Sequence, residues 1–288
     1  MRIILSRKGF DSSSGGSPSP ILPDGRMVSL PIPDKQSTIR YRDIRWQEFN
    51  LGSLVAALTR GRIPPSHFAH LDPDLSIDSL SRSTGWRPIF GQTGAAQGHL
   101  RNNNIQSGDV FLFFGLFQNV ALASEKLVWD ACSAKRHVLW GWLQVDEVVK
   151  VDDCAQSSYL WARYHPHFHR KRDPSNTVYV ARRNLTLPVA TPVELIGAGT
   201  FPNYSEQLVL TDSHSTSASQ WKLPEWFLPR DGKTPLTYHA DAARWKRADD
   251  GVRLNAVARG QEFIMDTYEF PEAVGWLVNL LRRHQGAR

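Results

Sequence analysis

The chain has 288 residues, of which 41% are hydrophobic and 22% are charged, a composition that is typical of a globular protein and excludes a disordered chain. No apolar run approaches the about 20 residues needed to span a bilayer. Two cysteines, Cys132 and Cys154, are too few for a disulfide-stapled secreted scaffold. The first apolar run is too short for a signal peptide. We therefore expect a soluble protein of the reducing cytoplasm, without membrane contact.

The balance of charge favours an anionic partner. Lys and Arg number 34 against 28 Asp and Glu, which leaves a formal charge of +6. Basic proteins attract polyanions, and the ten tryptophans supply rings that stack on bases as well as fill a core. We expect a nucleotide or a nucleic acid as the partner. The choice between DNA and RNA, and the oligomeric state, stay open.

The N-terminal half predicts a strand at 2–5, followed by a loop of small residues at 11–20. A second strand is expected at 26–32, after a tight turn. Apolar residues at helical spacing predict a helix over 46–58. The stretch 70–104 is rich in turn residues and shows no periodicity, which indicates binding loops or an element that the pattern hides.

The rest of the chain contains the clearest strand signals. We expect two adjacent buried strands at 110–114 and 138–145, because both runs are apolar and a modest excursion joins them. Further predictions are helical residues at 159–163, a strand at 177–181 paired with 185–187, strands at 207–210 and 263–266, a packed loop at 221–235, and an amphipathic helix at 271–283. Without a repeat or a flexible linker, residues 1–288 are expected to form one composite domain.

A known fold resembles the central region at 105–151. A Gly-Asp turn at Gly108 and Asp109 precedes an aromatic strand, and a second apolar strand with an internal glycine, Gly141, follows after an excursion. This order resembles the PUA-like barrels, including the ASCH and EVE domains. The resemblance implies an α+β fold with a PUA-like mixed β-barrel core, elaborated with peripheral helices and long loops. It also implies a cleft in which an unpaired base is read by stacking and hydrogen bonds.

A family resemblance extends over nearly the whole chain. It is carried by the run 5–20 with 30–34 behind it, and by later landmarks at 91–92, 108–115, 165–167 and 260–263. These segments resemble the third of the nucleotide modification associated domain families. The resemblance implies a link to nucleotide modification, and it implies no reaction and no catalytic residue.

The N-terminal loop is the first candidate for a nucleotide site. Glycine-rich turns let backbone N–H groups converge on an anion, and Arg7 and Lys8 add charge for a phosphate. The order of a Walker motif is absent, and a polar surface loop is the alternative. Amide side chains elsewhere are suited to reading base edges. The expected nucleotide-binding residues are Ser6, Arg7, Lys8, Ser12, Ser13, Gly15, Gly16, Gln92 and Gln261.

The candidate catalytic residues are Asp11, His165, His167 and Glu262, the last as a general base. On an extended strand, His165, His167 and His169 would share one side and could ligate a metal. A proline within the run and the basic cluster at 170–172 argue against this arrangement. We therefore expect no metal and no cofactor, and give these histidines a role in base or phosphate contact.

A pair of carboxylates, Asp72 and Asp74, flanks a proline. Such a pair can serve acid-base chemistry or bind Mg²⁺, but Asp-Pro-Asp is also an ordinary turn sequence, and the turn is the favoured interpretation.

Three functions follow from these patterns. The first is a protein linked to nucleotide modification that binds a nucleotide, or reads or processes an unpaired or modified base, in a basic cleft. The alternative is a hydrolase or transferase that acts on free nucleotides, with the N-terminal Gly/Ser loop holding phosphate. The third is a protein-interaction scaffold with incidental charge.

Overall fold

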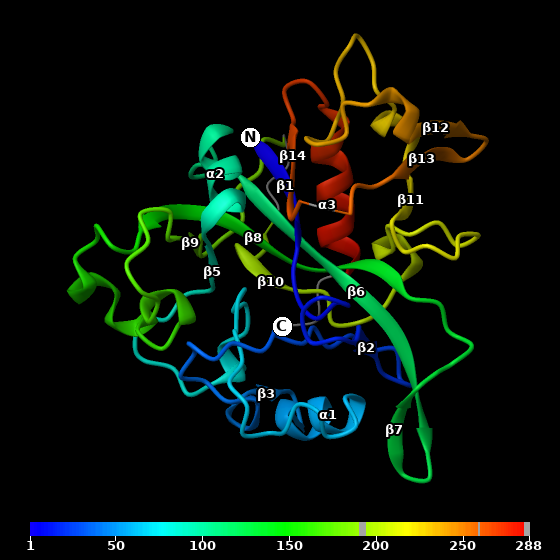
Figure 1. Cartoon of the computed structure of the whole chain (residues 1–288). Helices are drawn as coiled ribbons and strands as arrows, with labels where there is room; N and C mark the ends of the chain where they lie inside the picture. Colours follow the sequence, from blue (N-terminus) through cyan, green and yellow to red (C-terminus); the bar gives the residue numbers. More distant parts are fainter. Residues whose placement is uncertain (190–193, 259, 285–288) are drawn as a thin grey trace.

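A mixed sheet of nine strands forms the centre of the molecule in the computed structural model, which describes residues 1–189, 194–258 and 260–284 (Figure 1). Six strands follow one another across the sheet in the order β14 (Glu262–Asp266), β1 (Arg2–Arg7), β6 (Val110–Ala123), β8 (Arg136–Lys150), β9 (Thr177–Ala181) and β5 (Ile89–Gln92). The short strands β2 (Ser19–Ile21) and β7 (Lys126–Trp129) pair with β6, and β10 (Ala198–Thr200) pairs with β8.

The long strands β6 and β8 form the middle of this sheet. They pair antiparallel, with Val110 opposite Gln144, and a bulge follows Phe113. The predicted adjacency of 110–114 and 138–145 is therefore confirmed. The side chains of Phe111, Phe113 and Phe114 are fully buried, because this part of β6 has packed layers on both sides. These rings are consequently core residues and do not stack on a base.

The sheet stays open within the described residues. Strands β14 and β5 stand at the two ends of its order, and no pairing joins them. The α+β class is confirmed, whereas the PUA-like closed barrel over 105–151 is not, since closure requires the first and last strands to pair.

A second, smaller core lies beside the loops of the N-terminal half, around α1 (Leu51–Leu58). The helix predicted over 46–58 begins only at Leu51. A two-stranded hairpin of β3 (Arg45–Trp46) and β4 (Phe49–Asn50) occupies the expected first turn. The side chain of Asn50 then caps the helix by accepting a hydrogen bond from the N–H group of Ser53.

The C-terminal part adds a three-stranded sheet in the order β11 (Gln220–Leu223), β13 (Gly251–Asn255) and β12 (Trp245–Ala248). The closing helix, predicted at 271–283, is α3 (Glu272–His284), and it buries Leu277 and Leu281. The packed loop expected at 221–235 begins instead with β11 and a short 3₁₀ turn at Glu225–Phe227.

Several short elements differ from the sequence expectation. The hidden element in 70–104 is β5 with α2 (Gly94–Asn102), because a strand of four residues shows no measurable period. Of residues 26–32 only Arg26 and Met27 form isolated bridges, and 185–187 form no strand. Residues 207–210 begin in a 3₁₀ turn at Glu206–Leu208. The helical residues at 159–163 belong to a 3₁₀ segment, Gln156–Ala162. Of the helices in the described ranges, none is both long and apolar enough to cross a membrane.

Candidate functional site

A polar pocket of about 550 Å³ lies where the end of β1 meets the end of β5. Its walls come from segments that are far apart in the sequence, and most of its lining side chains are polar or charged. They are Arg7, Lys8, Asp11, Ser13, Ser14, Asp34, Lys35, Gln36, His70, Asp72, Gln92, Thr93, His167, Arg170 and Gln261. The fold therefore brings the N-terminal loop, Gln92, Gln261 and one of the predicted histidines to a common site.

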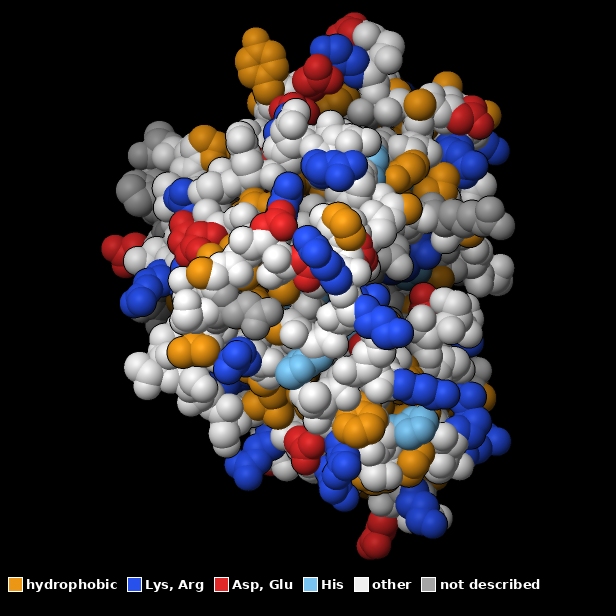
Figure 2. All heavy atoms as spheres, turned by 60° about the vertical axis from the view of Figure 1, so that its left-hand side comes forward, with side chains coloured by type: hydrophobic (Ala, Val, Ile, Leu, Met, Phe, Trp, Pro, Cys, Tyr) orange, Lys and Arg blue, Asp and Glu red, His pale blue; other side chains and the backbone are white. Residues whose placement is uncertain are grey.

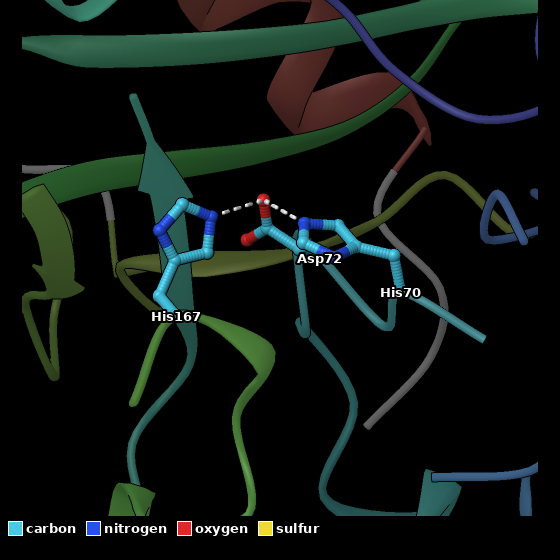
Figure 3. A group of neighbouring side chains, drawn as sticks. All are labelled: His70, Asp72 and His167. Atoms are coloured by element: carbon cyan, nitrogen blue, oxygen red, sulfur yellow. Dashed lines mark ion pairs between the residues drawn. The ribbon is translucent and has the colours of Figure 1, made fainter. Parts of the chain in front are cut away.

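Three side chains of this pocket meet around one carboxylate (Figure 3). Oδ2 of Asp72 lies 3.7 Å from Nε2 of His70 and 3.7 Å from Nε2 of His167. The side chain of His70 is 12% exposed, that of Asp72 is 5% exposed and that of His167 is 3% exposed. The three side chains are therefore largely shielded from solvent, and they still line the pocket. His70 and Asp72 come from one loop, and His167 comes from the short 3₁₀ turn Pro166–Phe168.

The backbone explains why His167 fits here. Its ring packs flat against β5 at Gly91, where a Cβ atom would stand only 2.3 Å from Cδ2 of the ring. The N–H group of Gly91 donates to Oδ1 of Asp72 at 2.7 Å. Gly91 therefore leaves space for the histidine and also orients the carboxylate.

Hydrogen bonds fix the ring nitrogen that each histidine turns toward Asp72. Nδ1 of His70 donates to Oδ2 of Asp34 at 2.7 Å, because an ionised carboxylate can only accept. Nδ1 of His167 donates to Oδ1 of Asn176 at 2.7 Å, and the amide of Asn176 is oriented by its own donation to the carbonyl of His167. Both Nε2 atoms are left facing Asp72.

The electrostatics of the three groups differ. Burial lowers the pKa of His167 to about 3, which keeps its ring neutral. Burial acts in the same direction on His70, but Asp34 and Asp72 outweigh it and raise the pKa of His70 to about 9. Burial would raise the pKa of Asp72, but the histidines around it hold that pKa well below its usual range. The carboxylate is therefore ionised at neutral pH.

The other two predicted histidines differ in position. The run 165–169 is not a strand, and its three histidines do not all share one side. His165 is fully buried with Nε2 3.2 Å from Oδ1 of Asp72, and neither ring nitrogen makes a well-aligned hydrogen bond within the described residues. His169 is exposed and outside the pocket lining. Histidines 165, 167 and 169 therefore do not form one ligand group, whereas His70, Asp72 and His167 lie close together among the described residues.

The two carboxylates that flank the proline separate into different roles. Asp72 belongs to the histidine cluster. Asp74 forms a two-pronged ion pair with Arg82, with N–O distances of 2.7 and 2.8 Å, and accepts from the Tyr164 hydroxyl at 2.6 Å. Asp74 is thus a structural residue. Asp72 is a candidate for function, although an ordinary turn was the favoured interpretation of the Asp-Pro-Asp sequence.

The cations predicted to hold phosphate are already engaged. Arg7 donates to the carbonyls of Ala258 and Val257 at 3.0 and 3.2 Å. Nζ of Lys8 pairs with Oε1 of Glu262 at 2.9 Å. Glu262 is 1% exposed and does not line the pocket, so a general-base role would require it to leave this ion pair.

The Gly/Ser loop is closed by its own hydrogen bonds. Oδ1 of Asp11 accepts from the backbone of Ser13 and Ser14, and the N–H group of Gly16 donates to the Asp11 carbonyl. These N–H groups already donate hydrogen bonds within the loop and are not directed at an anion. Ser13 and Ser14 line the pocket, whereas Ser6 is fully buried and Ser12, Gly15 and Gly16 lie outside the lining.

The amide residues fit the expectation better. Gln92 and Gln261 both line the pocket, and Nε2 of Gln92 donates to Oε1 of Glu262 at 2.7 Å. Sequence reasoning did not assign site roles to His70, Asp34 or Asn176. The signal for the first was a histidine two residues before an aspartate, a spacing too common to be diagnostic without the fold.

A family comparison decides the relationship of the chain to known proteins. The family described as nucleotide modification associated domain 3 matches residues 2–266, which is most of the sequence. The chain belongs to this family. Its membership links the chain to nucleotide modification, and the matched range contains every residue of the pocket. No curated protein and no solved structure matches the chain.

Proposed function

We propose that this family member binds a nucleotide, free or within nucleic acid, in the polar pocket and handles it during nucleotide modification. One observation carries the proposal. A single pocket of about 550 Å³ combines a cation, amide side chains and hydroxyl groups, contributed by segments from both ends of the chain. This volume lies within the range of small-molecule sites, and the three kinds of group match phosphate, base edge and sugar.

Arg170 is the best candidate for the phosphate contact. It lines the pocket and makes no ion pair or side-chain hydrogen bond with another described residue, in contrast to Arg7 and Lys8. A guanidinium offers two parallel donors to a phosphate. Lys35 lines the same wall and is exposed, so it adds a second positive charge.

Gln261 is the best candidate for reading a base edge. Its side chain is exposed at the pocket, and Gln92 beside it is buried and held by Glu262. The amide of Gln261 provides a donor and an acceptor, the combination that distinguishes bases, and its Oε1 accepts only one long hydrogen bond, from Nε2 of Gln92 at 3.4 Å. Among the described residues, no aromatic ring besides the histidines lines this pocket. We therefore assign base recognition to hydrogen bonds more than to stacking.

The charge on one face of the molecule favours a compact site over a long nucleic-acid track there. On the face drawn in Figure 2, lysine and arginine side chains (blue) are scattered with acidic side chains (red) among them. A duplex-binding surface commonly gathers its cations in a patch or stripe. The rival function, an enzyme acting on free nucleotides, gains support from the histidine–aspartate cluster at the same pocket.

Fluorescence anisotropy with nucleoside monophosphates and labelled single-stranded DNA and RNA at low salt tests the proposal. We expect Arg170→Ala to weaken binding of all ligands and to lower the log–log salt slope by roughly one. Gln261→Ala should chiefly reduce base preference. Arg172→Ala is the matched control, because this cation of the same segment is exposed and outside the pocket. If the parent binds none of these ligands, the nucleotide assignment fails and the scaffold function replaces it.

A further inference from the structure

The pocket contains three ligand atoms of the kind that transition metals prefer. Nε2 of His70, an oxygen of Asp72 and Nε2 of His167 lie within 4.8 Å of one another. On a tetrahedral ion with bonds of about 2.0–2.1 Å, ligand atoms stand about 3.3 Å apart. The 3.7 Å separations in this cluster need to shrink by only a few tenths of an ångström around an ion of that size.

The hydrogen-bond partners of the two histidines follow the pattern that metal-bound histidines show. Metal-ligating histidines almost always donate their other ring N–H to a carboxylate or carbonyl oxygen. His70 donates from Nδ1 to Asp34, and His167 donates from Nδ1 to the amide oxygen of Asn176. These hydrogen bonds leave Nε2 of each ring facing the Asp72 carboxylate at 3.7 Å, a separation that is too long for a hydrogen bond and leaves room for an ion between the atoms.

The two oxygens of the Asp72 carboxylate have different neighbours. Its Oδ1 is held by the N–H group of Gly91 at 2.7 Å and lies 3.2 Å from Nε2 of His165. Its Oδ2 is the oxygen that both other histidines approach. One oxygen is thus anchored to the protein, which leaves the second oriented for an ion.

The charge around the cluster suits a divalent ion. Asp34 and Asp72 supply two negative charges, and an ion bound at Nε2 of His70 replaces the proton on that nitrogen. Only Arg170 of the basic run 170–172 lines the pocket. Lys171 and Arg172 are exposed and outside the lining, so the repulsion expected from the sequence is smaller than three adjacent cations implied.

We propose that His70, Asp72 and His167 bind one divalent first-row transition-metal ion of the Zn²⁺, Mn²⁺ or Fe²⁺ type. All three residues line the pocket, so the ion keeps coordination positions open to a molecule bound there. The site departs from the sequence expectation of no metal, because two of its ligands lie about 95 residues before the histidine run. Metal binding is measured without nucleotide, so its failure is distinct from failure of the proposed function.

The test uses the full chain without a tag, stripped with a chelator and then titrated with Zn²⁺ by calorimetry. Mn²⁺ and Fe²⁺ are titrated in separate anaerobic runs, and metal content is measured by mass spectrometry after dialysis. We expect about one ion per chain. Co²⁺ should give visible absorption bands whose intensity reports low coordination number.

Variants assign the ion to this cluster. His70→Ala and His167→Ala should weaken binding at least about 100-fold, since loss of an outer-shell partner alone costs about 10- to 100-fold. His70→Gln and His167→Gln repeat the test with side chains that still fill the space, and circular dichroism checks their folding. His169→Ala is the matched control, because it removes an exposed histidine of the same segment.

Two results would overturn the proposal. A parent chain that binds none of the three ions at millimolar concentration has no such site. Binding that stays unchanged in folded His70→Gln and His167→Gln variants lies elsewhere on the protein. A site that is intact in a chain without affinity for nucleotides would instead retain the metal proposal and refute the nucleotide assignment.

Discussion

Lys8 and Glu262 lie 254 residues apart in the sequence, and their side chains form a largely buried ion pair of 2.9 Å. Lys8 directly follows β1, and Glu262 begins the antiparallel neighbour β14. Nζ of Lys8 also lies 4.6 Å from the centre of the Phe90 ring. Glu262 additionally accepts from Gln92, so this ion pair connects the first strand, the last strand and β5 behind the pocket.

Lys8→Met should lower the free energy of unfolding by about 3–5 kcal/mol, because it leaves the Glu262 carboxylate buried without a counter-ion. Denaturant unfolding measures the loss. The double variant Lys8→Met/Glu262→Gln should recover part of it, since the uncompensated charge is then gone. Arg247→Met is the control: the Arg247–Glu225 pair is 65% and 68% exposed and should contribute less than about 1 kcal/mol. Equal losses in Lys8→Met and Arg247→Met would contradict the buried pair.

Gly91→Ala should disturb the histidine cluster without changing any of its ligands. The new Cβ would stand 2.3 Å from the His167 ring and must push it away from Asp72. We expect Zn²⁺ affinity to fall by about 10- to 100-fold in a chain that still folds, as measured by calorimetry. Gly98→Ala on α2 is the matched control, because nothing lies within 4 Å of its added Cβ. Parent-like affinity in Gly91→Ala would refute this role of the glycine.

Asp72 and Asp74 should respond differently to the same substitution. Asp74→Asn leaves Arg82 without its buried counter-ion, so the free energy of unfolding should fall by about 3 kcal/mol while folded chains bind Zn²⁺ as the parent does. Asp72→Asn should lower Zn²⁺ affinity strongly. Thermal unfolding and calorimetry on both variants separate the effects, and a loss of metal binding in folded Asp74→Asn would contradict the division of roles.

His137 should make stability depend on pH. Its side chain is buried, accepts a hydrogen bond from Nε1 of Trp221 at 3.0 Å, and burial lowers its pKa from 6.5 to about 3. Below pH 6.5 the unfolded chain therefore takes up a proton that the folded chain refuses. The resulting loss of stability grows by about 1.4 kcal/mol for each pH unit between 6.5 and 3.

The variant His137→Gln keeps an acceptor for Trp221 and removes the titrating group. Its free energy of unfolding should fall less steeply between pH 6.5 and 5 than that of the parent, measured with denaturant at each pH. His214→Gln, which replaces an exposed histidine, should keep the parent's slope. Parallel curves for the parent and His137→Gln would show that His137 is not the proton-linked group.

The sequence by itself determined the elements whose signal is local. The consecutive apolar residues at 110–114 predict a buried strand, and the periodic apolar face of 271–283 predicts a helix. Both signals lie within the segment itself and do not depend on distant contacts. Family membership was also readable from the sequence, since landmark residues keep their order along the chain. In contrast, β5 was left unassigned and the start of α1 was predicted too early, because four-residue strands and a hairpin at a helix start have no such period.

Only the tertiary structure decided the site. In the sequence, His70 and Asp72 resemble ordinary turn residues, and only the fold brings His167 within 3.7 Å of the Asp72 carboxylate. The need for glycine at Gly91 is likewise visible only in the fold, where the His167 ring packs against it. Likewise, Lys8 reads as a free cation for phosphate until β1 pairs with β14 and places Glu262 beside it. Which charge stays free and which becomes paired depends on contacts between distant segments, and those contacts follow from strand order, which no local pattern encodes.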